Sequence, residues 1–105
     1  MNSWFILFLA GLFEVSWAIG LKFSQGFSKL LPSVLTVAGM IFSFVFLSLA
    51  LKKLPLSVAY AVWTGIGIAG TSILGVIIFQ ESISISKIIF VSFIVIGIVG
   101  LRISQ

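Results

Sequence analysis

The chain has 105 residues, of which 61% are hydrophobic and only 8% are charged, with a formal net charge of +4. A soluble domain of this length exposes too much surface for so few charges, so the composition argues against a soluble globular protein. The six basic residues form no basic face, which argues against nucleic-acid binding. Cysteine and histidine are both absent, which removes thiol chemistry, most zinc sites and the usual proton shuttle near neutral pH. We expect no bound metal, no cofactor and no enzymatic activity.

Four long apolar runs are separated by short polar connections, and each run is long enough to cross a bilayer as a helix. Helices are favoured over strands because a helix satisfies its own backbone hydrogen bonds in lipid. We expect the first run to be a retained span and not a cleaved signal peptide, because three comparable runs follow it. The sequence predicts an all-α, multi-pass integral membrane protein with one domain, 1–105, and antiparallel neighbouring helices at about 4–21, 30–51, 57–79 and 86–103.

The first run carries one carboxylate, Glu14, at a predicted depth of about 15 Å along the helix from Trp4, an expected interfacial anchor. A carboxylate at mid-membrane costs about 3 kcal/mol or more, so such residues face a cavity or a partner. Every Lys and Arg lies at a span end, so none is available inside a span to pair with Glu14. Burial favours the protonated form, and Glu14 is therefore predicted to bind either a proton or a cation. With alternating access to the two sides of the membrane, this competition becomes proton-coupled antiport.

Polar and aromatic side chains in the first three runs are candidates to line a cation site. Trp17 follows Glu14 at i+3 and so projects from the same helical face. The same spacing relates Tyr60 to Trp63 in the third run, and Ser43 is the polar residue nearest the centre of the second. Hydroxyl, indole and phenol groups suit a small cation through hydrogen bonds and cation–π attraction. Ordinary helix packing remains the alternative for each of them.

Glycines mark candidate contacts between helices. In the third run a small residue recurs every four positions from Gly67 to Gly75, a pattern that lets another helix approach closely. Gly65 and Gly67 also form a candidate hinge. The fourth run has no central polar group, and Gly97 and Gly100 leave a smooth surface on it, so we expect a dimerisation element there.

Basic residues are balanced between the two ends of the predicted bundle. Three lie on the side of the amino terminus and three on the other side, namely Lys52, Lys53 and Arg102 against Lys22, Lys29 and Lys87. An excess of Lys and Arg on the cytoplasmic side normally sets orientation, so this balance gives no preference. One interpretation is that copies insert both ways round and pair as an antiparallel, dual-topology dimer. The alternative is that lipid or a partner sets the orientation. Glu81 and Lys87 lie at a span end, and we assign neither a mechanistic role.

Taken together, these features resemble the small multidrug resistance family of bacterial exporters over essentially the whole chain. The resemblance rests on the four spans, the acid in the first span, the string "KFSQGF" followed by Pro32, and "AYAVWTGIG" at the start of the third span. Within the family, "GLFEVSWAIGLK" and "AVWTGIGIAGTSILG" are similar to the guanidinium-exporter branch. The branch that exports polyaromatic cations typically has a small residue at the position of Trp17.

The resemblance implies an antiparallel homodimer in the bacterial inner membrane that exports guanidinium in exchange for protons. Carried over by position, Glu14 would be the shared proton and substrate site, and Trp17, Ser43, Tyr60 and Trp63 would orient it and line the pocket. Guanidinium presents paired N–H groups that match a carboxylate. The alternatives are a broad-specificity exporter of quaternary ammonium compounds, a passive cation channel, a non-transport protein such as a proton-ring subunit, and a transporter with a non-identical paired subunit.

Overall fold

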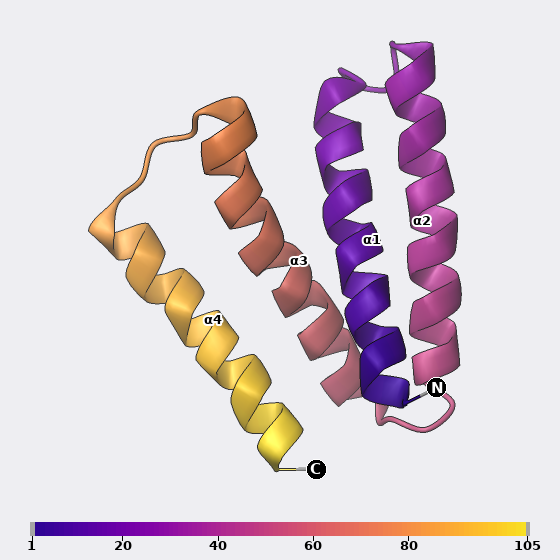
Figure 1. The fold of residues 1–105 in the computed structure, drawn as a ribbon, viewed down its shortest axis with the longest axis vertical. Coiled ribbons are helices and arrows are strands. Elements are labelled where there is room, and N and C mark those ends of the chain that lie inside the picture. The colour runs from indigo at the N-terminus through magenta and orange to yellow at the C-terminus, as the bar shows by residue number, and fades with distance from the viewer. Residues whose placement is uncertain (1, 105) are drawn as a thin grey trace.

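The computed structural model describes residues 2–104, which form four α-helices and contain no strand. The helices are α1 (Ser3–Phe23), α2 (Leu30–Ala50), α3 (Leu56–Phe79) and α4 (Ile85–Ile103), as Figure 1 shows. Each is long and apolar enough to cross a membrane. The all-α prediction is confirmed at this level, and the helix ends differ from the predicted ends by at most two residues.

A tight turn reverses the chain between α1 and α2. Three successive residues in it, Gln25, Gly26 and Phe27, have positive φ. The buried Ser24 hydroxyl stabilises the turn, because it accepts a hydrogen bond from the Phe27 amide at 3.0 Å and donates one to the Leu21 carbonyl at 2.7 Å. The result is an antiparallel pair of helices that lie side by side (Figure 1).

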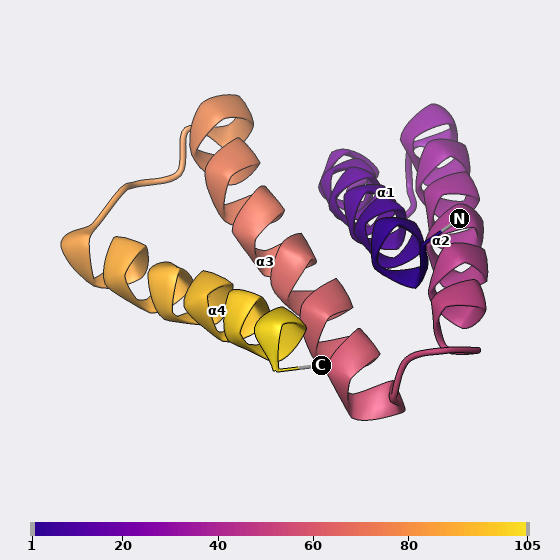
Figure 2. The same ribbon diagram turned by 60° about the horizontal axis from the view of Figure 1, so that its bottom comes forward.

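The four helices do not form a closed bundle. α1 lies between α2 and α3 and packs against both, whereas α4 lies at the edge of the molecule against α3 (Figures 1 and 2). The beginning of α1, the α2–α3 connection and the end of α4 share one end of the molecule, and the other two connections share the opposite end (Figure 1). Because α1 is central, its side chains contact residues of both α2 and α3.

The buried core lies where α1, α2 and α3 meet. Its members are small or aliphatic residues and one tryptophan, namely Leu7, Ala10, Ala50, Ala59, Val62 and Trp63. The carboxyl half of α4 joins its margin through Ile98 and Leu101, and the Arg102 guanidinium lies 4.9 Å from the centroid of the Trp4 ring. None of the residues that the structure describes in α4 is itself buried. The core therefore holds three helices firmly and the fourth loosely.

Candidate cation-binding site

Glu14 lies midway along α1, on the face that meets the middle of α3. A Cβ atom at Gly67 would overlap the Glu14 carboxylate, so a residue without a side chain is needed for this close approach. One turn along, Gly70 faces the side chain of Val15 in the same way. Glycines on α3 therefore let the acid of α1 sit directly against the α3 backbone.

A cavity of about 170 Å³ lies between the two helices at this level. Its lining comes from one face of α1, with Glu14, Trp17 and Ala18, and from one face of α3, with Thr64, Gly67, Ile68 and Thr71. Trp17 and Ala18 follow Glu14 by three and four positions, and Gly67 and Ile68 follow Thr64 by the same steps, which is the spacing of a single helical face. The structure therefore brings Glu14, Trp17 and Gly67, three of the predicted residues, to one cavity.

Three polar atoms in the cavity wall are buried without a hydrogen-bond partner among residues 2–104. They are Glu14 Oε1, Trp17 Nε1 and Thr64 Oγ1. Buried polar groups nearly always have a partner, so water or a polar ligand in this cavity would satisfy these three atoms. The ion pairs in the described part of the chain involve Glu81 and leave Glu14 without a basic partner. An ionised Glu14 would thus present an uncompensated negative charge, which a cation satisfies.

Ser43 and Trp63 are buried and hydrogen-bonded, but they do not reach the Glu14 carboxylate. The Trp63 indole Nε1 donates to Ser43 Oγ at 3.0 Å, and the Ser43 hydroxyl donates to the Ala10 carbonyl at 2.8 Å. In an α-helix the carbonyl of Ala10 also accepts the backbone N–H of Glu14, four residues later. This chain of hydrogen bonds therefore fixes α1 against α2 and α3 one turn before the acid.

Tyr60 and the remaining glycines lie outside the cavity. The side chain of Tyr60 is 54% exposed, and its ring centroid lies 5.5 Å from that of Trp63. Gly65 allows the close approach of Ile98 from α4. A Cβ atom at Gly97 or at Gly100 would meet nothing within 4 Å, so both glycines lie on an open face of α4.

Thr64 lines the cavity, although it was not among the predicted site residues. It lies at i−3 from Gly67 and i−7 from Thr71, so helical spacing places all three on one face of α3. That pattern is visible in the sequence, but it becomes a site signal only when this face is known to meet Glu14.

The chain matches the family model for "Small Multidrug Resistance protein" over residues 2–94. It is 51% identical over 103 residues to the guanidinium exporter of Proteus vulgaris, a match that covers 98% of this chain and 99% of that protein. The guanidinium exporter of Yersinia pseudotuberculosis serotype I is also 51% identical with the same coverage, and that of Salmonella typhimurium strain LT2 is 49% identical over 97% of each chain. The resemblance found in the sequence is confirmed: the chain belongs to the small multidrug resistance family of membrane transporters, which are not enzymes.

Proposed function

We propose that this protein is an antiporter that exports guanidinium across the bacterial inner membrane in exchange for protons, with Glu14 as the site that both ligands share. The observation that carries the proposal is the half-buried Glu14, whose Oε1 atom is buried in a cavity with no basic partner and beside two other unpartnered polar groups. The names of relatives that are about half identical over nearly the whole chain support the choice of guanidinium.

The polar groups of the cavity match the hydrogen-bonding needs of this cation. Guanidinium is a donor on every edge, so an ionised Glu14 accepts a pair of its N–H groups, and the hydroxyl of Thr64 accepts another. The Trp17 indole is itself a donor, so on cation binding it would pair not with the cation but with the Glu14 carboxylate, to which it makes no hydrogen bond in this structure. Each cavity group thereby acquires a partner when the cation binds.

The same chemistry makes the two ligands exclusive. A protonated Glu14 is neutral and presents an O–H donor toward a ligand that can only donate. Proton and guanidinium therefore compete for one carboxylate, and a carrier that changes its accessible side when either is bound exchanges one for the other. A tetra-alkyl ammonium ion has no N–H to donate, so it would use the charge of Glu14 but leave Thr64 without its hydrogen bond.

We further propose that the working unit is an antiparallel homodimer. Three observations support it: the equal number of basic residues at the two ends of the molecule, the open face of α4 around Gly97 and Gly100, and the exposed ring of Tyr60 on α3. A second copy in the opposite orientation would cover the open face and supply the inverted repeat that transporters use around a midplane site.

Proton-driven guanidinium uptake into proteoliposomes tests the function. We expect a proton gradient to drive uptake, and Glu14→Gln to abolish it because an amide neither ionises nor accepts a cation in place of a proton. Guanidinium binding to the unmodified protein should weaken as the pH falls, because protons then occupy Glu14, and this pH dependence should vanish in Glu14→Gln. Lys29→Gln, which removes an exposed charge far from the cavity, is the control.

The outcomes separate the alternatives. Coupled uptake that survives in Glu14→Gln would reject Glu14 as the exchange site. Guanidinium flux that is indifferent to the proton gradient would indicate a channel, and a tetra-alkyl ammonium ion that competes as strongly as guanidinium would indicate a broad-specificity exporter.

A further inference from the structure

A second cavity, of about 220 Å³, adjoins the Glu14 cavity, and the two share Ala18 and Thr71 in their walls. The rest of its lining lies nearer the end of the molecule that carries the α3–α4 connection: Ile19, Lys22, Gly75, Phe79 and Glu81. The two cavities together run between α1 and α3 from mid-membrane toward this end. Along α1 the passage extends about 12 Å, the rise of the two turns between Glu14 and Lys22.

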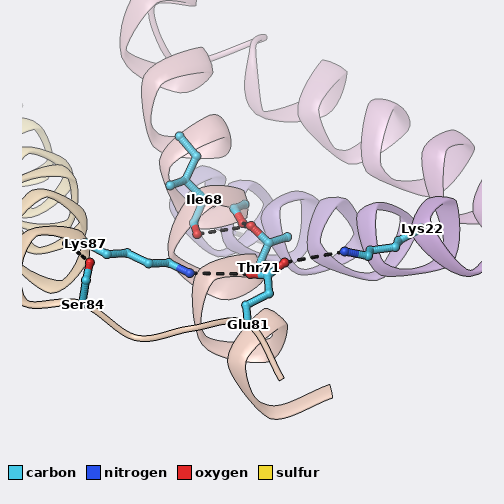
Figure 3. Close-up of polar contacts among 7 residues, drawn as sticks. Lys22, Ile68, Thr71, Glu81, Ser84 and Lys87 are labelled. Carbon is cyan, nitrogen blue, oxygen red and sulfur yellow. Dashed lines mark hydrogen bonds and ion pairs between the residues drawn. The ribbon is translucent and has the colours of Figure 1, made fainter. Parts of the chain in front are cut away.

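The outer end of the passage is a cluster of charged groups. Glu81 lies between two lysines (Figure 3), with its Oε2 3.8 Å from Lys22 Nζ and its Oε1 3.5 Å from Lys87 Nζ. The Lys22 ammonium also lies 4.8 Å from the centroid of the Phe79 ring. The Glu81 carboxylate and the Phe79 face therefore together hold the Lys22 ammonium, and the same carboxylate also pairs with Lys87.

The backbone places Glu81 over the passage. Gln80 ends α3 in the left-handed conformation, with φ 54°, and the Glu81 amide then bonds back to the Gly75 carbonyl at 3.2 Å. The Glu81 carboxylate packs on Gly75, where a Cβ atom would overlap it. Both acids of the chain thus lie against a glycine of α3, Glu14 on Gly67 and Glu81 on Gly75, at the two ends of the same passage.

We propose that the outer end of the passage, formed by Lys22, Phe79 and Glu81 and here called the mouth, is a second cation site. Guanidinium would bind there on its way between Glu14 and the aqueous phase, in the place that the Lys22 ammonium now occupies. The site would hold guanidinium by hydrogen bonds to the Glu81 carboxylate and by contact with the Phe79 face. Lys22 is then a tethered competitor, which closes the mouth when no substrate is there. This inference rests on the proposed transport of guanidinium.

Guanidinium can replace the Lys22 ammonium on Glu81 because the ion pair between Lys22 and Glu81 is weak. The side chains of Lys22 and Glu81 are 58% and 43% exposed, and ion pairs with this much exposure contribute little. Between the two acids, the Thr71 hydroxyl donates to the Gly67 carbonyl at 2.7 Å, which leaves its oxygen free to accept an N–H of the passing cation. Glu81, Thr71 and Glu14 thus form a line of acceptors along the passage.

Guanidinium uptake as a function of concentration tests the mouth, with four variants of the full chain. We expect Glu81→Gln and Phe79→Leu each to raise the apparent KM about two- to fivefold, the size of a cation contact at an exposed site. Lys22→Gln should lower the apparent KM, since it removes the competitor. The control, Lys29→Gln, removes a lysine in the α1–α2 connection at the same end of the molecule and should change nothing.

Two results would overturn the site. If Lys29→Gln lowers KM as much as Lys22→Gln, the total positive charge at this end of the molecule controls uptake, and Lys22 does not compete with guanidinium for Glu81. If Phe79→Leu leaves KM unchanged while the protein folds normally, the aromatic face does not bind the cation.

A binding measurement keeps this proposal separate from the transport proposal. In Glu14→Gln protein, which lacks the inner site, guanidinium titration should shift the NMR signals of the Lys22 side chain and the Glu81 amide. Shifts without proton-driven uptake by the unmodified protein would support the mouth and reject the transport cycle. Proton-driven uptake by the unmodified protein without these NMR shifts would support the transport cycle and reject the mouth.

Discussion

α1 and α4 have similar lengths, 21 and 19 residues, and both are apolar, but they are packed very differently. Residues of α1 such as Leu7, Ala10 and Val15 are buried by α2 and α3, whereas no described residue of α4 is buried. Glycines show the same contrast, since Gly11 of α1 lies directly against Ile66 and Gly97 of α4 faces open space. Hydropathy thus identifies a span without saying what covers it.

Because α1 is buried and α4 is open, substitutions on the two helices should affect different properties of the protein. The Glu14 cavity is built from α1 and α3 alone, so changes at their contact act directly on cation binding. α4 supplies no residue to that cavity, so changes on its open face should act through assembly with another copy or with lipid. Two substitutions test this division, and a third tests the hydrogen-bonded link from α2 to α1 and α3; they follow in order of decreasing effect.

Gly67→Ala should have the largest effect, because the added methyl group would displace the Glu14 carboxylate. Overpacking of this kind typically costs about 1–3 kcal/mol, and where this cost falls on the cation-bound state it corresponds to a roughly five- to 160-fold loss of guanidinium affinity. Equilibrium binding to purified protein at fixed pH measures the loss. Affinity equal to that of the unmodified protein would show that the carboxylate does not need this close contact.

Ser43→Ala should have an intermediate effect, mainly on stability. It leaves the buried Trp63 Nε1 without its acceptor and breaks the link to Ala10, which should lower the free energy of unfolding by about 1–3 kcal/mol. Unfolding in detergent measures the change. The matched control is Ser16→Ala, since the exposed Ser16 hydroxyl donates to Leu12 within α1 and makes no link between helices. An equal loss in both variants would contradict a structural role for the Ser43 link.

Gly97→Ala should have the smallest effect on the single chain, because the new Cβ meets nothing within 4 Å. Removing a glycine from the helix interior should if anything stabilise α4, by up to about 1 kcal/mol. If two copies pack through this face, however, the methyl group should shift the equilibrium from dimer to monomer in lipid, as measured by energy transfer between labelled copies. An unchanged dimer fraction would remove Gly97 from the interface.

Much of the architecture was predictable because its causes are local. Four apolar runs of membrane-spanning length, with Gly26 and Pro55 in the connections, place the helix ends to within two residues. The site was partly predictable for a similar reason. A lone acid in an apolar run identifies Glu14, and helical spacing puts Trp17 on its face.

The groups that surround Glu14 were not predictable in the same way. The sequence singled out Ser43, Tyr60 and Trp63, yet within one chain the cavity wall opposite Glu14 comes from Thr64 and its neighbours on α3. Likewise, the sequence placed Glu81 at a span end, but only the left-handed turn at Gln80 brings its carboxylate back over Gly75.

The sequence by itself determined that the chain lies in a lipid bilayer, that it has four spans, and that Glu14 is the acid within the first span. Each of these follows from the polarity and spacing of residues that are close together in the chain. The tertiary structure decided which face of α3 meets α1, which glycines the two acids rest on, and that one passage joins them. The physical reason is that contacts between helices depend on how whole surfaces fit together, and residues about 50 positions apart in the chain contribute equally to that fit.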